Sequence, residues 1–178
     1  MKGGIVLVTG GARSGKSRYA EESARATGGR LLYIATAEAR DEEMARRIAA
    51  HRARRGAEWT AVEAPVEIAR ALTENRGRFD AALVDCVTLW LSNLLERADE
   101  TAIDGAVGAF IAGARDFGAP VFVVTNELGS GIVPESALAR KFRDVAGWTN
   151  QRLAAAADEV VLMVAGLPVV VKEGGTCG

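Results

Sequence analysis

The sequence has few of the residues that build disulfide frameworks or zinc sites, and it lacks the excess of positive charge that is typical of nucleic-acid-binding proteins. Its 178 residues include two cysteines, Cys86 and Cys177, and one histidine, His51. The cysteines lie far apart without a metal-type spacing, so we expect free thiols in a reducing compartment and no disulfide. Lysine and arginine total 22 against 23 for aspartate and glutamate, and a net charge of −1 gives no general attraction for nucleic acid or an anionic membrane.

Long apolar runs are also lacking. No stretch approaches the roughly eighteen apolar residues that a membrane-spanning helix needs. A strand-like run begins at Ile5, which leaves no room for a signal peptide. These two absences predict a cytoplasmic protein without a membrane span. The length suits one domain over residues 1–178, with a mobile glycine-rich tail at 173–178.

What the sequence does contain is a phosphate-binding loop (P-loop) near its N-terminus. The pattern G-x-x-x-x-G-K-[ST] is filled by Gly10, Gly11, Ala12, Arg13, Ser14, Gly15, Lys16 and Ser17. A short apolar run precedes it and good helix formers follow, which is the strand–loop–helix context that the mechanism needs. Lys16 would reach the β- and γ-phosphates of a nucleoside triphosphate, and the Ser17 hydroxyl would bind Mg²⁺. The alternative is a glycine-rich turn that binds nothing.

Strand-like and helix-like stretches alternate along the rest of the chain. We expect strands at 5–9, 31–35, 59–62, 81–85, 120–124, 160–164 and 169–171, and helices at 18–26, 41–55, 65–75, 87–97, 101–117 and 136–157. This alternation predicts an α/β fold, a mainly parallel sheet flanked by helices. The last two strands are joined by a short turn at 166–168, which favours an antiparallel C-terminal strand. Apolar positions at Leu138, Phe142, Val145, Trp148 and Leu153 predict a core-facing stripe on the last helix.

Four polar clusters stand where predicted strands end, at 10–17, 36–40, 85–88 and 125–127. Ligands of parallel sheets bind beyond the carboxyl ends of strands, so these clusters should converge. Asp85 closes an apolar strand, as the second Mg²⁺ anchor of a P-loop site does, and the alternative is an aspartate that caps the next helix. Thr125-Asn126-Glu127 could touch a nucleotide or second substrate, or form a polar turn.

His51 lies on the predicted helix 41–55 among several arginines. Its spacing from Met44 and Ile48 allows a packing role on the apolar face, whereas the arginines suit a phosphate-rich ligand. A neutral imidazole is also a competent nucleophile. The residues alone leave both roles open for His51, and they likewise leave open whether Glu63 and Arg13 face solvent or a ligand.

The ordered set of motifs resembles one family, the bifunctional adenosylcobinamide kinase / adenosylcobinamide-phosphate guanylyltransferase of cobalamin biosynthesis. The resemblance covers nearly the whole chain. It depends on residues 8–17, on Tyr33-Ile34-Ala35-Thr36, on Asp41-Glu42-Glu43-Met44 with His51 downstream, on Asp85-Cys86-Val87-Thr88, on Val124-Thr125-Asn126-Glu127, on Gly131-Ile132-Val133-Pro134-Glu135 and on residues 150–158.

The resemblance implies two reactions. ATP or GTP phosphorylates adenosylcobinamide; GTP then guanylylates a histidine, which matches His51, and GMP passes to adenosylcobinamide phosphate to give adenosylcobinamide-GDP. The family's nucleotide contacts fall on the P-loop and on Thr36, Ala37, Glu38, Arg52, Ala53, Arg54, Arg55, Glu63 and Asp85. It also implies a RecA-like P-loop architecture, Mg²⁺ on Ser17 and Asp85, and a homo-oligomer, a trimer.

Two other functions compete with this interpretation. A single-activity small-molecule P-loop kinase would use His51 only for packing or substrate positioning. A nucleotide-dependent switch or assembly module would hydrolyse nucleotide slowly and bind no corrinoid.

Overall fold

The computed structural model describes residues 3–39, 42, 45–46, 49 and 56–174. The predicted helix 41–55, with His51 and Arg52–Arg55, lies almost entirely outside the described residues, as does Cys177. The elements run in the order β1 (Ile5–Gly10), α1 (Lys16–Ala26), β2 (Leu31–Ala35), β3 (Trp59–Glu63), α3 (Ile68–Glu74), β4 (Ala81–Asp85), α4 (Val87–Leu95), α5 (Glu100–Asp116), β5 (Val121–Val124), α6 (Ala137–Ala156), β6 (Glu159–Val164) and β7 (Leu167–Lys172). Within this part of the chain, no helix is both long and apolar enough to cross a bilayer.

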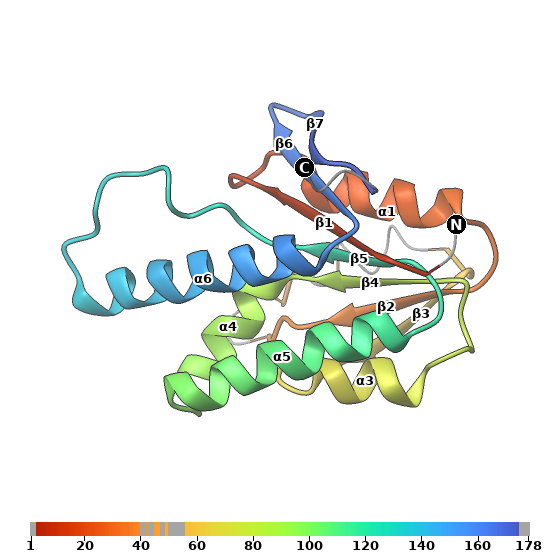
Figure 1. Cartoon of the computed structure of the whole chain (residues 1–178), viewed down its shortest axis with the longest axis horizontal. Coiled ribbons are helices and arrows are strands. Elements are labelled where there is room, and N and C mark those ends of the chain that lie inside the picture. The colour runs from red at the N-terminus through yellow and green to blue at the C-terminus, as the bar shows by residue number, and fades with distance from the viewer. Residues whose placement is uncertain (1–2, 40–41, 43–44, 47–48, 50–55, 175–178) are drawn as a thin grey trace.

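One seven-stranded sheet organises these elements, in the order β3-β2-β4-β5-β1-β6-β7. All neighbouring strands are parallel except β6 and β7, which form the antiparallel pair that the short connection predicts. Helix α1 covers one face, and α3, α4, α5 and α6 lie on the other (Figure 1). The central strands are therefore buried on both faces, as their continuous apolar sequences require.

Helix α6 is less buried than its apolar stripe predicts. Val145 and Leu153 are buried, but Leu138 is 71% exposed and Trp148 is 59% exposed. Leu138 lies in the first turn of α6, where the helix extends beyond the edge of the sheet (Figure 1), whereas Trp148 lies in the C-terminal half of α6 and borders a hollow between α5 and α6. The prediction of a core-facing stripe is therefore wrong for Leu138 and Trp148.

The helix predicted at 65–75 is shorter than its sequence suggests. It begins at Ile68, because side chains of α4 bind the backbone before it. Trp90 Nε1 donates to the Val66 carbonyl at 2.7 Å, and Asn93 Nδ2 donates to the Pro65 carbonyl at 2.9 Å. These tertiary hydrogen bonds hold residues 65–67 outside the helix.

The hairpin of β6 and β7 closes the sheet at one edge. Its turn uses two left-handed residues, Ala165 at φ 50° and Gly166 at φ 85°. The Gly166 amide donates to the Ser14 carbonyl at 3.0 Å, so the turn lies against the phosphate-binding loop. At the other end of the hairpin, Lys172 Nζ donates to the carbonyls of Ala154, Ala155 and Ala157 at the end of α6. This places a cation where the helix dipole favours it.

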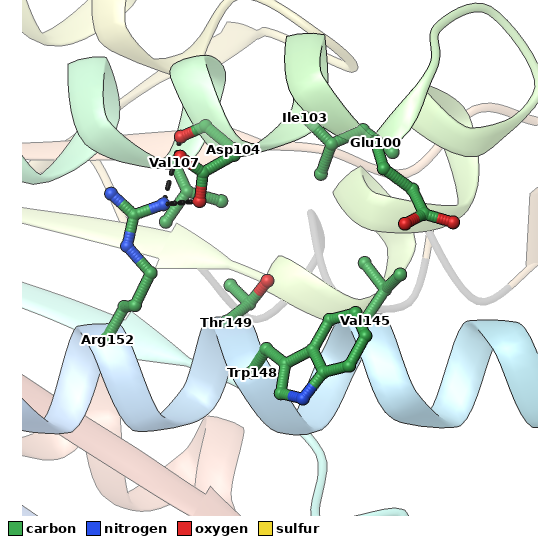
Figure 2. Close-up of a pocket in the computed structure, with 8 residues that line it drawn as sticks. All are labelled: Glu100, Ile103, Asp104, Val107, Val145, Trp148, Thr149 and Arg152. Carbon is green, nitrogen blue, oxygen red and sulfur yellow. Dashed lines mark hydrogen bonds and ion pairs between the residues drawn. The ribbon is translucent and has the colours of Figure 1, made fainter.

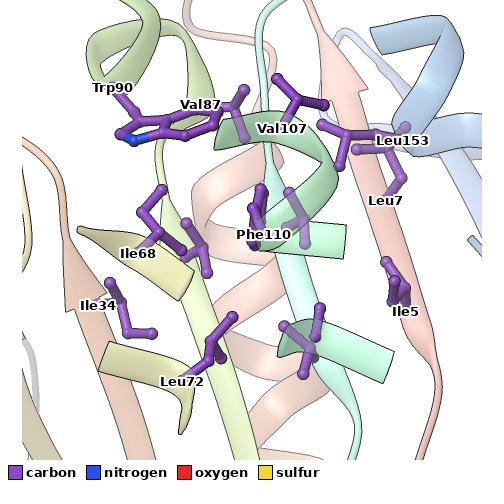
Figure 3. Close-up of a cluster of buried hydrophobic side chains, with 14 of the residues drawn as sticks. Ile5, Leu7, Ile34, Ile68, Leu72, Val87, Trp90, Val107, Phe110 and Leu153 are labelled. Carbon is purple, nitrogen blue, oxygen red and sulfur yellow. The ribbon is translucent and has the colours of Figure 1, made fainter. Parts of the chain in front are cut away.

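The larger core lies between the sheet and helices α3 to α6 (Figure 3). Phe110 of α5 is fully buried there, and its ring meets Trp90 of α4 edge to face with centroids 5.7 Å apart. Ile5, Leu7 and Leu153 belong to the same cluster. The contact fixes α4 and α5 on one another, and α4 begins at Val87, two residues after Asp85.

Phe110→Ala should lower the free energy of unfolding by about 3–5 kcal/mol, because it removes a buried ring and leaves a cavity. Ile132→Ala, at a side chain that is 97% exposed, is the matched control and should change it by less than about 0.5 kcal/mol. Urea unfolding of the two variants beside the parent measures both values. Equal effects would contradict this view of the core.

Candidate active site

The phosphate-binding loop lies between the end of β1 and the start of α1. Gly10 has φ 151°, and a Cβ there would meet the Met163 carbonyl at 2.6 Å and Ser14 Oγ at 2.8 Å. Gly15 precedes α1 with φ 93°. The first turn of α1 has no acidic residue and no side-chain cap, which leaves its amides and the helix dipole available to an anion.

Ser14 and Lys16 show that this loop suits a phosphate. The Ser14 hydroxyl is buried, and none of the described residues hydrogen-bonds to it. Burial lowers the pKa of Lys16, although the nearby Cys86 and Asp85 oppose that shift. Its ammonium group donates to the Gly11 carbonyl at 2.9 Å. A phosphate oxygen would satisfy Ser14 and would favour the charged form of Lys16.

Asp85 stands at the end of β4, opposite the first turn of α1. The Ser17 hydroxyl donates to its Oδ1 at 3.4 Å, and the Tyr33 hydroxyl donates to its Oδ2 at 2.9 Å. Ser17 and Asp85, the two residues expected to hold Mg²⁺, are thus in direct contact with each other. These are oxygen donors of the kind that Mg²⁺ prefers. In the described part of the chain no three histidine, cysteine, aspartate or glutamate side chains gather as a metal site, so a cation here would depend on nucleotide oxygens as well.

Thr36 is fully buried at the end of β2, and its hydroxyl is already used by the protein. Thr36 Oγ1 donates to the Cys86 carbonyl at 2.8 Å and accepts a hydrogen bond from the Cys86 amide at 2.8 Å. The Asp85–Cys86 peptide bond that it holds is cis. The Thr36 side chain therefore positions the backbone next to Asp85. The Thr36 amide also donates to the Asp85 carbonyl at 3.3 Å.

The other predicted contacts spread along the same edge of the sheet. Ala37 and Glu38 are half-buried, and the Glu38 carboxylate pairs with Arg97 at 2.8 Å. Glu63 is exposed at the end of β3. Arg13 is exposed in the loop with φ 57°. Because β3 and β1 are separated by four strand spacings of roughly 4.8 Å, Glu63 lies about 19 Å along the sheet from the P-loop strand. It cannot contact phosphates held by that loop.

The fourth predicted cluster, at the end of β5, joins the others through hydrogen bonds. The Glu127 amide donates to the Gly10 carbonyl at 3.0 Å. The Asn126 amide and Nδ2 both donate to Thr88 Oγ1, at 3.0 and 2.9 Å. The ends of β1, β4 and β5 thus meet as the sequence predicts, and the end of β2 joins them through Thr36.

Three further residues support the site although the sequence analysis does not predict them as site residues. Tyr33 orients Asp85, Asn93 Nδ2 donates to the Thr36 carbonyl at 2.9 Å, and Asn150 Nδ2 donates to the Asn126 carbonyl at 3.0 Å. A buried tyrosine needs a hydroxyl partner, which is a weak signal for Tyr33. Identifying that partner requires the strand register, which pairs Tyr33 with Leu83, two residues before Asp85.

A separate hollow lies between α5 and α6 (Figure 2). Its cavity volume is about 60 Å³, and its walls include Ile103, Val107, Val145 and the half-exposed Trp148. Arg152 closes one side through hydrogen bonds to Asp104. None of the predicted site residues lines it, and it is too small for a nucleotide.

Comparison with known proteins agrees with this geometry. The sequence model of one family, described as cobinamide kinase / cobinamide phosphate guanyltransferase, matches residues 6–171. The chain is 45% identical over 166 residues to the bifunctional adenosylcobalamin biosynthesis protein CobP of Pseudomonas aeruginosa, covering 93% of this chain and 96% of that protein. It is 46% identical over 181 residues to the bifunctional protein CobU of Salmonella typhimurium, covering 94% and 99%.

Solved structures at low identity share the fold alone. A KaiC-like protein from Pyrococcus horikoshii superimposes with a TM-score of 0.61 at 15% identity, covering 99% of this chain and 82% of that one. The RadB recombinase gives 0.56 at 16% identity, covering 90% and 74%. The expected RecA-like P-loop fold, with its antiparallel C-terminal strand, is confirmed.

The buried Cys86 thiol should make stability depend on pH. Burial raises its pKa to about 11, and the neighbouring Asp85 carboxylate adds to the rise. The unfolded chain therefore loses this proton first, and the folded state loses stability as pH rises from about 9 towards 11. The equilibrium constant for unfolding should increase by up to about tenfold per pH unit in that window.

Urea unfolding at pH 8, 9 and 10, without nucleotide or Mg²⁺, measures this dependence. Cys86→Ala is the control, because it removes the thiol and leaves all other titrating groups in place. The parent should lose stability with pH more steeply than Cys86→Ala, and equal slopes would contradict the assignment.

Proposed function

Because the chain belongs to the cobinamide kinase / cobinamide phosphate guanyltransferase family, we propose that it catalyses both reactions of that name. It phosphorylates adenosylcobinamide with ATP or GTP, and it then transfers GMP from GTP to adenosylcobinamide phosphate, giving adenosylcobinamide-GDP. The observation that carries the proposal is the P-loop with the Ser17 hydroxyl on Asp85. The buried Ser14 hydroxyl, to which none of the described residues hydrogen-bonds, also supports it.

In the kinase step, the loop amides and Lys16 hold the β- and γ-phosphates. Lys16 and the N-terminus of α1 then stabilise the charge of the transferring γ-phosphoryl group. Ser17 and Asp85 would hold Mg²⁺, which when bound neutralises charge on the β- and γ-oxygens. Tyr33 keeps the Asp85 carboxylate in place through its hydrogen bond to Oδ2.

In the guanylyl-transfer step, an imidazole nitrogen of His51 attacks the α-phosphorus of GTP and pyrophosphate leaves. The phosphate of adenosylcobinamide phosphate then takes the GMP group and frees the histidine. Arg52, Ala53, Arg54 and Arg55 belong to the same segment and contribute nucleotide contacts. Thr36–Glu38 and Glu63 contact the part of the nucleotide remote from the P-loop, in keeping with the separation of about 19 Å between β3 and β1.

His51→Asn should abolish covalent labelling of the protein by GTP labelled at the α-phosphate, because asparagine cannot form the phosphoramidate. Phosphorylation of adenosylcobinamide should persist in this variant. Lys16→Ala is the paired variant and should lower phosphoryl transfer by at least about a hundredfold. Labelling is measured after denaturation and phosphoryl transfer with γ-labelled nucleotide.

Two outcomes would overturn parts of this function. Covalent label in His51→Asn equal to that of the parent would exclude His51 as the nucleophile. A parent that phosphorylates adenosylcobinamide but takes no label would support the single-activity kinase in place of the bifunctional enzyme.

We also propose a cytoplasmic enzyme of one domain that assembles as a homo-oligomer, a trimer. Support for assembly comes from β7, an edge strand whose Leu167, Val169 and Val171 side chains are all about half exposed or more. An exposed apolar edge strand is a hazard in a free monomer, since it can pair with other chains. A second copy of this chain covering β7 would remove that hazard.

The double variant Val169→Asp/Val171→Asp should therefore dissociate the assembly into monomers, because it places two carboxylates in an apolar interface. Light scattering after size-exclusion chromatography measures the mass. Ala61→Asp, on the exposed edge strand β3 at the opposite side of the sheet, is the matched control and should leave the mass unchanged. An unchanged mass in the double variant would exclude β7 from the interface.

A further inference from the structure

The turn at Thr125–Glu127 extends β5 between the two halves of the phosphate site. Strand β5 lies between β1 and β4, with Val124 in register with both Val8 and Asp85. Beyond Val124, the Thr125 amide donates to the Val8 carbonyl and the Glu127 amide to the Gly10 carbonyl, each at 3.0 Å. Asn126 therefore stands at the carboxyl edge of the sheet, with the P-loop on one side and the start of α4 on the other.

Asn126 is held more firmly than its position in a loop suggests. Its backbone amide and its Nδ2 both donate to Thr88 Oγ1, which fixes the side-chain rotamer. Its carbonyl accepts a hydrogen bond from Asn150 Nδ2, and Asn150 Oδ1 in turn accepts one from Thr125 Oγ1 at 2.8 Å. Within the described part of the chain, these bonds leave Asn126 Oδ1 as the amide atom without a partner.

Glu127 is a weaker candidate for the same role. Its side chain is exposed, and its Oε1 accepts a hydrogen bond from the Gly129 amide at 2.6 Å. The carboxylate thus serves its own loop, whereas Asn126 is half-buried and oriented by three hydrogen bonds. Preorganised polar groups are the ones that contribute most to transition-state stabilisation.

We propose that Asn126 is a catalytic residue of the phosphoryl-transfer step: its Oδ1 accepts a hydrogen bond from the acceptor hydroxyl and aligns that oxygen with the γ-phosphorus held by Lys16. The proposal rests on the kinase activity of the proposed function. The hydroxyl oxygen forms a bond to the γ-phosphorus, and the bond from that phosphorus to the β–γ bridging oxygen breaks. The bonding electrons leave with the nucleoside diphosphate. The amide is not a base, so the hydroxyl proton passes to an oxygen of the transferred phosphoryl group.

This role predicts unequal effects on the two reactions, since the acceptor hydroxyl takes part only in phosphoryl transfer. Asn126→Ala should lower kcat for phosphorylation of adenosylcobinamide by about a hundredfold to a thousandfold, with KM for the nucleotide changed by less than about threefold. Guanylylation of the protein by α-labelled GTP should fall by less than about threefold. The ratio of the two activities is the quantity to compare.

Asn150→Ala is the matched control, because it removes support for the same turn without touching the acceptor. It should lower the two activities by similar factors, of no more than about tenfold. A purely structural role for Asn126 predicts that Asn126→Ala behaves like Asn150→Ala. Loss of both activities by one factor in Asn126→Ala, or a kinase kcat within threefold of the parent, would overturn the proposal.

Asn126→Leu keeps the size of the side chain without its acceptor oxygen, and covers the case in which the alanine variant does not fold. This variant should also lower kinase kcat by at least about tenfold, and a kcat equal to that of the parent would reject the role. If the parent takes no α-label, the guanylyl-transfer part of the function fails and Asn126 is judged on the kcat and KM of the kinase. If the parent does not phosphorylate adenosylcobinamide, the proposed function and this role both fail.

Discussion

The position of β5 between β1 and β4 is the constraint on which the phosphate site depends. The P-loop strand β1 and the Asp85 strand β4 are two strand spacings apart, with β5 between them. Val8, Val124 and Asp85 are in register across these three parallel strands, so the P-loop and Asp85 lie at the same carboxyl edge of the sheet. The Ser17–Asp85 and Glu127–Gly10 hydrogen bonds follow from that register. Burial of the same three strands on both faces supplies the stiffness that a preorganised anion site needs.

The local sequence was sufficient to predict the P-loop and most helices and strands, because glycine spacing, apolar runs and short connections are patterns of a few neighbouring residues. Strand order cannot be predicted from such local patterns. The Tyr33–Asp85 contact and the role of Asn150 depend on strand order, so the sequence does not predict them either. Thr36 illustrates the same limit, since its hydroxyl binds a backbone 50 positions later in the chain. Leu138 and Trp148 fit a buried periodicity, but Leu138 lies where α6 extends past the sheet and Trp148 borders a hollow between α5 and α6. The segment with His51 lies outside the described residues, so its role stays a prediction.

The sheet edge carries two groups of polar residues rather than one compact pocket. One group, at β1, β4 and β5, is joined by hydrogen bonds and centres on Lys16 and Asp85. The other, at β2 and β3, includes Glu38 and Glu63. Thr36 joins the two groups, because its hydroxyl hydrogen-bonds to the Cys86 backbone next to Asp85. A nucleotide can thus be held at its phosphates while its remote end lies over different strands. In the proposed function, the substrate hydroxyl attacks the γ-phosphorus and His51 attacks the α-phosphorus, and such a division would allow one end of the nucleotide to stay fixed in both reactions.

The neighbours of β1 also determine when the P-loop can form during synthesis. Strand β1 is made first, yet it pairs with β5 and β6, and its Ile5 amide binds the side chain of Asp158, 153 positions later. The Ser14 carbonyl likewise accepts its hydrogen bond from the amide of Gly166, which is synthesised much later. A ribosome therefore completes nearly the whole chain before the nucleotide loop has its supports. The high contact order of these pairings makes folding slow relative to helical proteins. Nucleotide binding can stabilise the fold only after these pairings have formed.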